Sequence, residues 1–436
     1  STIFNQKIDL IQLLRQIPDE HILKIATKSK VDHYAKVLNG RLMFYLLLSG
    51  ILRTDKLSQR GLADSFSSPL FRTLFNFKGK PTISHSSISD RLSTMNTDFF
   101  RECYETIYHI FSSLYSTKEI ENLCLQRVDS TLVSEACNHL KQGMPCGNLY
   151  GKKKMMKYTI NFDGMFASFA TTHSGDSEAS ESHVLPENVL SHFQKIKDHS
   201  SVYILDRGQN SAEAFRTMKS QDGLLFVGRL TDKRKMLVVE DLKKGNDVFT
   251  DGDLLEDKLV KLYKREEKLN KEGRKVVTTR LVDETFRVVR FKPQGKGEIL
   301  LITNCLELTA QTITQIYRRR WDIEVFFRFI KQELNFSHFL SMNENGIQIV
   351  MYMTLITAML VMIYKRENNI GYTTAVRRMG IELENLIMAI IVIESGGDLN
   401  KTQPDLLSEN LGALEKTRKK EYMEKDNHGQ YFFFRT

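Results

Sequence analysis

The sequence predicts an α/β protein of several domains, in which a mixed sheet with helices lies between two helical regions. Apolar residues recur at helical spacing through the first part of the chain, and strand-like runs alternate with helices from residue 121 onward. A length of 436 residues is enough for about two or three domains with a large core. The expected divisions are a helical domain at 1–120, a sheet domain at 121–230, a β-rich insertion at 231–305, the rest of the sheet domain at 306–365 and a helical region at 366–436.

The composition indicates a soluble globular protein. Hydrophobic residues make up 41% of the chain and charged residues 26%, as in ordinary globular proteins. The net charge of +9 favours a polyanionic partner, although many soluble proteins are mildly basic. The five cysteines are odd in number and scattered, unlike a disulfide framework, and no signal peptide is recognisable. We therefore expect a protein of the reducing cytoplasm.

Two segments allow other interpretations. Cys137, His139 and Cys146 resemble metal ligands, but a zinc site would need a fourth donor at suitable spacing. The segment Ile347–Tyr364 is almost wholly apolar and just reaches the roughly 18 residues that a membrane span needs. Because polar residues interrupt it and it stands alone, we interpret it as a buried helix of a large core and expect no membrane association.

The first 120 residues contain a pattern that resembles a helix-turn-helix unit. Longer helices are expected at Ile8–Gln16, Arg41–Leu52 and Phe99–Leu114. Two short helices, Leu57–Phe66 and Ser84–Met95, lie on either side of a basic turn at Lys78–Pro81. Ser84–Asn96 would then be the reading helix, with its Ser, His and Arg side chains on DNA phosphates and base edges. The alternative is a helical packing domain without DNA contact.

From residue 123 the pattern changes to strands. Strands are expected at Leu125–Ser134, Tyr158–Phe162, Phe166–Thr172, Val202–Leu205 and Leu224–Leu230, and helices at Val184–Lys197 and Ser211–Ser220. Asp163-Gly164 predicts a tight hairpin between the second and third strands. Three antiparallel strands followed by helix, strand, helix and strand is the order of an RNase H-like core with a mixed five-stranded sheet.

Two aspartates take defined positions in this order. Asp129 lies in the first, central strand, and Asp206 ends the fourth strand, which lies beside the first in such a sheet. A carboxylate in the middle of a strand is costly to bury unless it is paired or bound to a metal. The carboxyl ends of the strands are also where open α/β sheets bind ligands.

The segment 231–305 departs from this pattern and is expected to be a β-rich insertion. Strand-like runs occur at Val276–Leu281, Thr285–Phe291 and Ile299–Thr303, with turns between them. A dense charge run at Lys264–Lys275 predicts a solvated, basic edge. The sheet domain resumes at Thr309–Thr314, which is expected to cap the next helix.

The stretch Tyr317–Lys331 carries the most specific pattern in the chain. On one α-helix, advancing about 100° per residue, four of its side chains fall within a wedge about 60° wide: Tyr317, Arg320, Glu324 and Lys331. A carboxylate held between cations suggests a divalent metal beside a phosphate-rich ligand. The alternative is a solvated helix face with ordinary ion pairs.

Asp129, Asp206 and Glu324 together would form a carboxylate site for two hard cations, Mg²⁺ or Mn²⁺. Two such ions suit in-line displacement at a phosphodiester, with Arg320 and Lys331 neutralising the phosphates. A glycine-rich phosphate loop of the Walker type is absent from the sequence, so no nucleotide cofactor is expected.

These residues resemble a known family. The spacing of Tyr317, Arg320, Glu324 and Lys331 matches the Tyr-x2-Arg-x3-Glu-x6-Lys signature of the DDE transposases of bacterial insertion sequences, in the group that includes hairpin-forming cut-and-paste enzymes. Trp321, the mid-strand Asp129 and the Asp206-Arg207-Gly208 turn match as well, and the resemblance covers roughly 120–365.

The resemblance implies a reaction and partners. Asp129, Asp206 and Glu324 would bind two metals, water would nick each transposon end, and the 3′-hydroxyl would form a hairpin before joining target DNA. Tyr317, Arg320 and Lys331 would contact phosphates, and the only tryptophan, Trp321, would stack on a flipped base, although it could equally be a core residue. The partners would be the transposon ends and target DNA in the bacterial nucleoid, bound by a homodimer.

Some alternatives stay open. An RNase H-like nuclease without strand transfer and a domesticated DNA-binding regulator have the same sequence pattern in part. An acidic loop with Asp176, Glu178 and Glu181 offers another metal ligand, but a polar loop before a helix is the simpler interpretation. The segment Leu411–His428 is interpreted as a charged, solvated tail.

Overall fold

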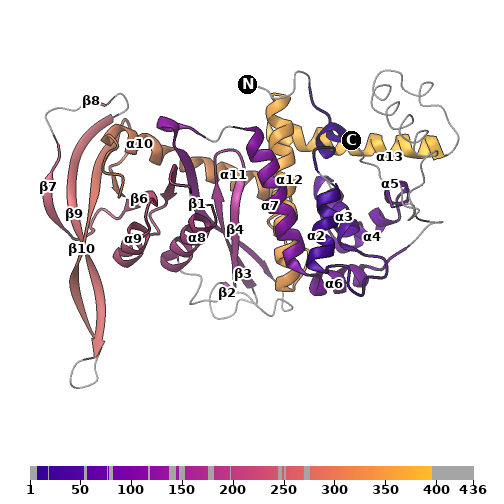
Figure 1. Ribbon diagram of the computed structural model, residues 1–436, viewed down its shortest axis with the longest axis horizontal. Helices are drawn as coiled ribbons and strands as arrows, with labels where there is room; N and C mark the ends of the chain where they lie inside the picture. Colours follow the sequence, from indigo (N-terminus) through magenta and orange to yellow (C-terminus); the bar gives the residue numbers. More distant parts are fainter. Residues whose placement is uncertain are drawn as a thin grey trace. The chain divides into compact units, whose positions relative to one another are not determined.

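The computed structural model of the chain describes residues 7–17, 19–53, 56–75, 77, 82–115, 118–136, 144–146, 153–174, 181–196, 198–243, 248–249, 252–269 and 275–394. The chain divides into two compact units. Unit 1 comprises Ser1–Leu114, His139–Lys141 and Phe329–Thr436, and unit 2 comprises Tyr115–Asn138 and Gln142–Arg328 (Figure 1). The helical regions expected at both ends of the sequence belong largely to unit 1. Residues 329–365, which were expected to be part of the sheet domain, also belong to unit 1, whereas the insertion and most of the rest of the sheet domain belong to unit 2.

Unit 1 is helical. Its helices are α1 (Leu10–Leu14), α2 (Asp19–Ser29), α3 (Gly40–Leu52), α4 (Gln59–Phe66), α5 (Pro69–Leu74), α6 (His85–Thr94), α7 (Thr97–Leu114), α12 (Glu344–Glu367), α13 (Tyr372–Glu394) and the end of α11 (Trp321–Glu333). Side-chain oxygens of Asn39, Ser58 and Ser84 accept hydrogen bonds from the first turns of α3, α4 and α6, which fixes where these helices begin. The prediction missed α2 and α5.

The expected helix-turn-helix pair is therefore incomplete. The helix α5 lies between α4 and α6, because Ser68 and Pro69 begin a new helix with proline in its first turn. The predicted basic turn at Lys78–Pro81 lies outside the described residues.

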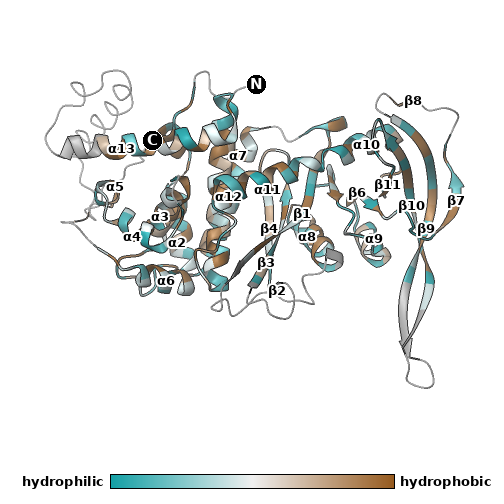
Figure 2. Ribbon diagram, turned by 180° about the vertical axis from the view of Figure 1, so that it is seen from behind, coloured by the Kyte–Doolittle hydropathy of each residue, from teal (hydrophilic) through white to brown (hydrophobic). Residues whose placement is uncertain are grey.

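The apolar segment interpreted as a buried helix is α12. By length and composition α12 could cross a membrane, but 83% of its most apolar window is buried inside the protein. Within unit 1 it packs against α3, α6, α7 and α13, and Figure 2 shows hydrophobic residues along much of its length. It has the burial expected of a core helix.

In the described part of the chain, unit 2 is built on one 11-stranded sheet. Its strands are β1 (Cys124–Ala136), β2 (Met144–Cys146), β3 (Lys153–Phe162), β4 (Ala167–His173), β5 (Ser201–Leu205), β6 (Leu225–Leu230), β7 (Met236–Asp241), β8 (Val248–Phe249), β9 (Gly252–Leu269), β10 (Lys275–Pro293) and β11 (Ile299–Thr303). Its helices are η1 (Ile120–Asn122), α8 (Glu181–Ile196), α9 (Ala212–Lys219), α10 (Ala310–Arg318) and the first part of α11. The strand order is β2-β3-β1-β5-β6-β11-β10-β9-β7, with β4 on β3 and β8 on β9.

Five of these strands have the predicted directions. Strand β3 is antiparallel to β1 and β4, whereas β5 is parallel to β1 and β6. The turn between β3 and β4 contains Gly164 with a φ of 95°, and Oδ1 of Asp163 accepts hydrogen bonds from the amides of Met165 and Phe166. Asp163-Gly164 thus forms the expected hairpin turn, because the aspartate binds the turn amides and glycine tolerates a positive φ.

Helices cover both faces of this part of the sheet (Figure 1). On one face, α8 and α9 bury Leu185, Val189 and Phe215 against β1, β5 and β6. On the other face, α10 packs Ile313 and Ile316 against β5, β6 and β11. The parallel strands are therefore buried on both sides.

The insertion extends the same sheet, which is consequently larger than the five strands expected. Strand β10 is continuous, and the turn predicted between Leu281 and Thr285 is a shift of register in its pairing with β9. The charged segment before it was not expected to be a strand, yet it forms β9, which pairs with β10 over the length of both.

Candidate functional site

Asp129 lies in the middle of β1. Because side chains alternate along a strand, it shares a face of the sheet with Arg127, two residues earlier. Its Oδ1 accepts a 2.7 Å hydrogen bond from the amide of Ser130, and its side chain is 20% exposed. A mostly buried carboxylate at this position needs cationic partners.

Asp206 follows β5 directly. The parallel register pairs Val128 with Leu205, so Asp129 and Asp206 are the next residues on two neighbouring strands. The structure thus brings the two aspartates together, as the strand order predicted.

The residues Tyr317–Lys331 do not form one continuous helix, which corrects the prediction. Helix α10 ends at Arg318, a turn follows, and α11 begins at Trp321. At the break, the amides of Asp322 and Ile323 donate to carbonyls only three residues earlier, those of Arg319 and Arg320. The 60° wedge assumed regular helix throughout, so it does not apply across this break.

Arg320, in the turn, meets all three predicted carboxylates. Its Nη1 lies 3.7 Å from Oδ2 of Asp129, its Nε lies 3.6 Å from Oδ1 of Asp206, and its Nη2 donates to Glu324. Burial alone lowers the pKa of Arg320, but the carboxylates of Asp206 and Glu324 raise it above its ordinary value. Arg320 is therefore a permanent cation at the centre of a carboxylate cluster.

Tyr317, near the end of α10, is buried and its hydroxyl lies 3.5 Å from Oδ1 of Asp206. Burial, together with the negative charge of Asp206, raises the pKa of Tyr317 to about 12. The group thus stays protonated and acts as a hydrogen-bond donor near neutral pH.

The other two residues of the pattern lie on α11. Trp321 begins the helix and is 53% exposed, so its ring is not a core residue. Lys331 lies on the part of α11 that belongs to unit 1, and burial lowers the pKa of its ammonium group.

The donor chemistry of this cluster suits a divalent cation. Carboxylate oxygens from β1, the end of β5 and α11 converge on one guanidinium, and hard cations such as Mg²⁺ and Mn²⁺ prefer oxygen ligands. Among the described residues, no three His, Cys, Asp or Glu side chains are already grouped as ligands of one ion. The three carboxylates fit a divalent cation in the chemistry of their donor atoms, and in this structure each of them contacts the Arg320 guanidinium.

Arg91 on α6 does not point outward as the reading-helix prediction required. Its Nε and Nη2 donate to the backbone carbonyls of Leu38 and Val31, at 2.7 and 2.5 Å. The serine hydroxyls at the start of α6 are exposed, and Ser84 shares hydrogen bonds with Ser86 and Ser87. The Arg91 guanidinium is therefore bound inside the protein, whereas the polar start of α6 is exposed.

The minor candidates cannot be placed. Cys137, His139, Asp176 and Glu178 and the segment Leu411–His428 lie outside the described residues, as do the side chains of Cys146 and Glu181.

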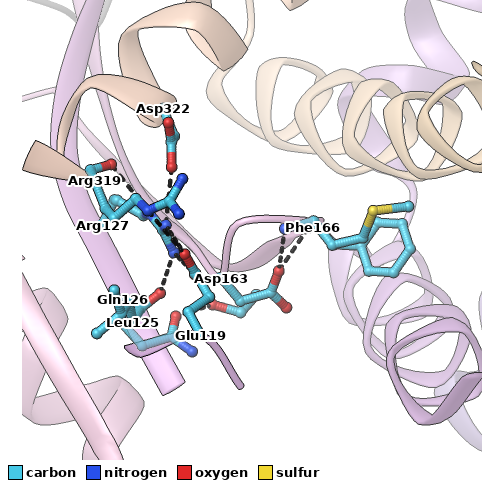
Figure 3. Close-up of polar contacts among 10 residues, drawn as sticks. Glu119, Leu125, Gln126, Arg127, Asp163, Phe166, Arg319 and Asp322 are labelled. Carbon is cyan, nitrogen blue, oxygen red and sulfur yellow. Dashed lines mark hydrogen bonds and ion pairs between the residues drawn. The ribbon is translucent and has the colours of Figure 1, made fainter. Parts of the chain in front are cut away.

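One residue of the site was missed from the sequence. Arg127 on β1 is fully buried, and all five of its N–H groups donate (Figure 3): two to the carboxylate of Glu119, and one each to the Leu125 carbonyl, the Arg319 carbonyl and Asp322. The only signal available in the sequence was an arginine two residues before Asp129 in the same predicted strand.

A mixed sheet with one aspartate in the middle of a strand, a second at the end of the neighbouring parallel strand and a glutamate on an adjacent helix defines a carboxylate site of the kind that binds divalent cations. Comparison with known protein families assigns the family, because the family model described as "Transposase DDE domain" matches residues 124–360. The chain therefore belongs to the transposase DDE-domain family.

Individual relatives match over different lengths. A probable transposase of insertion sequence element IS5377 from Geobacillus stearothermophilus is 39% identical over 61 residues, 14% of this chain and 16% of that protein. The protein y4zB of Sinorhizobium fredii, which is named as a transposase, is 34% identical over 85 residues, 20% of this chain and 24% of that protein. The chain therefore matches less than a quarter of the length of each of these two relatives.

Two longer matches are more distant. A protein named as a transposase of insertion sequence element IS4SA from Synechocystis is 24% identical over 306 residues, 68% of this chain and 77% of that protein. A solved piggyBac transposase synaptic complex with hairpin DNA aligns with a TM-score of 0.44 at 12% identity, covering 99% of this chain and 88% of that one.

Proposed function

We propose that this protein is an active transposase of a bacterial insertion sequence. It binds double-stranded DNA at the ends of the element, hydrolyses a phosphodiester bond at each end and joins the released 3′-hydroxyl groups to target DNA. The observation that carries the proposal is the meeting of Asp129, Asp206 and Glu324 around Arg320 in a chain of the DDE family. The names of the relatives, transposases of insertion sequence elements, support it.

The strand order supports an RNase H-like fold for the catalytic part. The order β4-β3-β1-β5-β6, with β3 antiparallel to its neighbours, places Asp129 and Asp206 side by side at the centre of the sheet. Strands β7–β11 then form the insertion between the second aspartate and Glu324. The helical residues 1–120 are the proposed DNA-binding domain.

The chemistry follows from the residues of the cluster. Asp129, Asp206 and Glu324 are the proposed ligands of two Mg²⁺ or Mn²⁺ ions, which when bound would supply Lewis-acid activation of attacking and leaving oxygens. Water attack at phosphorus forms a new P–O bond and breaks the bond to the 3′-oxygen, which leaves as a 3′-hydroxyl. That hydroxyl later attacks a phosphorus of the target strand, where a new P–O bond forms and the 3′-oxygen of the target strand leaves as a hydroxyl. Arg320 and Lys331 are the proposed phosphate contacts, and the neutral Tyr317 hydroxyl donates to Asp206 or to a phosphate oxygen.

Three further parts of the proposal rest on the four-residue signature. The 3′-hydroxyl first attacks the opposite strand to form a hairpin, and hydrolysis of the hairpin releases the 3′-hydroxyl again before it joins target DNA. The exposed ring of Trp321 stacks on a flipped base in the hairpin. The enzyme works as a homodimer on paired ends. It acts on DNA of the bacterial nucleoid.

The test is cleavage of a DNA fragment that carries the element's own ends, with Mg²⁺, by the wild-type chain and by Glu324→Gln. We expect metal-dependent nicking by the wild type and a loss of at least about 10³-fold in the variant, because one carboxylate ligand is removed. DNA binding, measured by gel shift, should be retained in both. Equal nicking by both proteins would remove Glu324 from the chemistry.

The same assay separates the alternatives. A nuclease without strand transfer would nick the ends but would not join a precut end to target DNA. A DNA-binding regulator would bind the ends tightly and nick nothing. The presence of all three carboxylates favours the active enzyme over the regulator.

A further inference from the structure

Arg127 connects the central strand to the break between α10 and α11. Its Nη1 holds its own strand through the Leu125 carbonyl at 2.7 Å, while Nε and Nη2 reach the Arg319 carbonyl at 3.1 Å and Asp322 at 2.9 Å. Its remaining two N–H groups form a fork on Glu119. A fully buried arginine with all five donors bound holds its partners in one fixed geometry.

The position of Arg127 on β1 relates it to the carboxylate cluster. Arg127 and Asp129 lie on the same face of the strand, about 7 Å apart along it. Opposite them, Arg319 and Asp322 meet Arg127, whereas Arg320 meets Asp129 and donates to Glu324. Arg127 and Asp129, two neighbouring positions on one face of β1, thus contact different residues of the break between α10 and α11.

At the break, the Arg319 carbonyl has other partners than it would have in a continuous helix. In a continuous helix this carbonyl would accept from the amide of Ile323, four residues later. Here that amide bonds to Arg320, and the Arg319 carbonyl accepts from Asp322 and from Arg127 instead. In a regular helix Tyr317, Arg320 and Glu324 would lie on one face, so closing the break would keep Glu324 on that face but change its position relative to Arg320 and the two aspartates.

We propose that Arg127 is a positioning residue for catalysis: by binding the Arg319 carbonyl and Asp322 it maintains the break and sets the register that places Glu324 opposite Asp129. This inference rests on the proposed function, because Glu324 matters only as part of the carboxylate site. Arg127 itself touches neither the substrate nor the reacting atoms.

Asp322→Ala tests the proposal with little risk to folding. The Asp322 side chain is 39% exposed, and Arg127 keeps the carboxylate of Glu119 as its counter-ion when Asp322 is removed. Glu333→Ala is the matched control, because it removes the same charge from the same helix and its hydrogen bond is to Thr373, not to Arg127. Arg127→Lys is a second variant, which keeps the buried charge but loses the fork.

The readouts are Mn²⁺ affinity of the DNA-free protein, kcat and KM for nicking of end-bearing DNA, and thermal unfolding. For Asp322→Ala we expect about 10-fold weaker Mn²⁺ binding and about 10²-fold lower kcat, with KM and Tm close to wild type, because misplacing one group by about 1 Å has effects of this size. Arg127→Lys should weaken Mn²⁺ binding in the same way, and Glu333→Ala should change none of the readouts.

Two results would overturn the proposal. One is a kcat and a Mn²⁺ affinity within twofold of wild type in Asp322→Ala. The other is a loss of Mn²⁺ affinity and kcat in Arg127→Lys that is fully explained by its lower Tm, because Arg127 would then have only a structural role. Failure of the proposed function is a separate result, since the wild type would then not nick DNA, and the Mn²⁺ titrations would still decide whether Arg127 shapes the cluster.

Discussion

The hydroxyl oxygen of Tyr317 on α10 lies 3.5 Å from Oδ1 of Asp206 at the end of β5. Burial is the main cause of the raised pKa of Tyr317, Asp206 adds to it, and Arg320 opposes it. The proton on this hydroxyl is therefore held more tightly in the folded protein than in the unfolded chain.

This pKa predicts how stability depends on pH. The pKa of Tyr317 is about 12 in the folded protein and 10.0 ordinarily, so the stabilisation is complete below pH 10 and is lost between pH 10 and 12. We expect the difference in free energy of unfolding between wild type and Tyr317→Phe to fall by about 1.4 kcal/mol per pH unit across that window. Denaturant unfolding of both proteins at pH 9, 10, 11 and 12 measures it. A difference that stays constant to pH 12 would contradict the raised pKa.

Gly164 lies against the buried ion pair of Arg127. A Cβ atom at this position would lie 2.8 Å from Oε1 of Glu119 and 2.9 Å from Nη1 of Arg127, and the φ of 95° is unfavourable for any other residue. We expect Gly164→Ala to lower the free energy of unfolding by about 2–4 kcal/mol, from backbone strain and displacement of the ion pair together. Thermal and denaturant unfolding measure this loss.

Gly295→Ala is the matched control for that variant. Gly295 also has a positive φ, 67°, but a Cβ there meets nothing within 4 Å. Its replacement should therefore cost only the backbone term, about 1 kcal/mol. Equal losses in the two variants would show that crowding of Arg127 and Glu119 contributes nothing.

The positions of Asp129 and Asp206 were predictable because both depend on strand order. The order of strands and helices along the chain indicates which strands are antiparallel and which are parallel. It therefore places the strand of Asp129 beside the strand that ends at Asp206. The break after α10 was not predictable. Periodicity describes a helix only locally, whereas the Arg319 carbonyl is bound by Arg127, a residue 192 positions earlier in the chain.

Long-range partners also explain the other differences. The inward turn of Arg91 depends on carbonyls 53 and 60 residues away. Strand β9 carries many charges that suggested a solvated segment, and only its long pairing with β10 makes it a strand. In both cases the local composition was interpreted correctly as polar, but the partner that decides the conformation is distant.

Arg287 and Asp257 form a second buried ion pair in unit 2. Nε and Nη2 of Arg287 donate to the two carboxylate oxygens at 2.8 and 2.7 Å, and Nη1 donates to the carbonyls of Leu306 and Leu308, just before α10. We expect Arg287→Met to lower the free energy of unfolding by about 3–5 kcal/mol, because it leaves Asp257 buried without a counter-ion. Equilibrium unfolding in urea measures the loss.

The double variant Arg287→Met/Asp257→Leu separates the charge from the packing. It removes both buried charges, so most of the lost stability should return, leaving the cost of the two unbound carbonyls. If the double variant is as unstable as Arg287→Met, the loss comes from the loop before α10 and not from the unpaired Asp257.

Arg320 lies between the carboxylates that are the proposed cation ligands, which predicts opposite effects on cation binding and on catalysis. Arg320→Gln removes a positive charge that competes for the oxygens of Asp129, Asp206 and Glu324. We expect Mn²⁺ to bind the DNA-free variant about 10-fold more tightly, because an attraction between carboxylates and guanidinium no longer has to be broken. Nicking should nevertheless fall, because a phosphate contact is lost.

Titration of free Mn²⁺ by electron paramagnetic resonance, at constant ionic strength, measures the first effect, and nicking of end-bearing DNA measures the second. Arg216→Gln is the control, since Arg216 forms an exposed ion pair with Glu213 on α9, away from the cluster. Weaker Mn²⁺ binding in Arg320→Gln than in Arg216→Gln would mean that Arg320 orders the carboxylates for the cation instead of competing with it. The assignment of Arg320 as a side chain that must move before the cation binds would then be wrong.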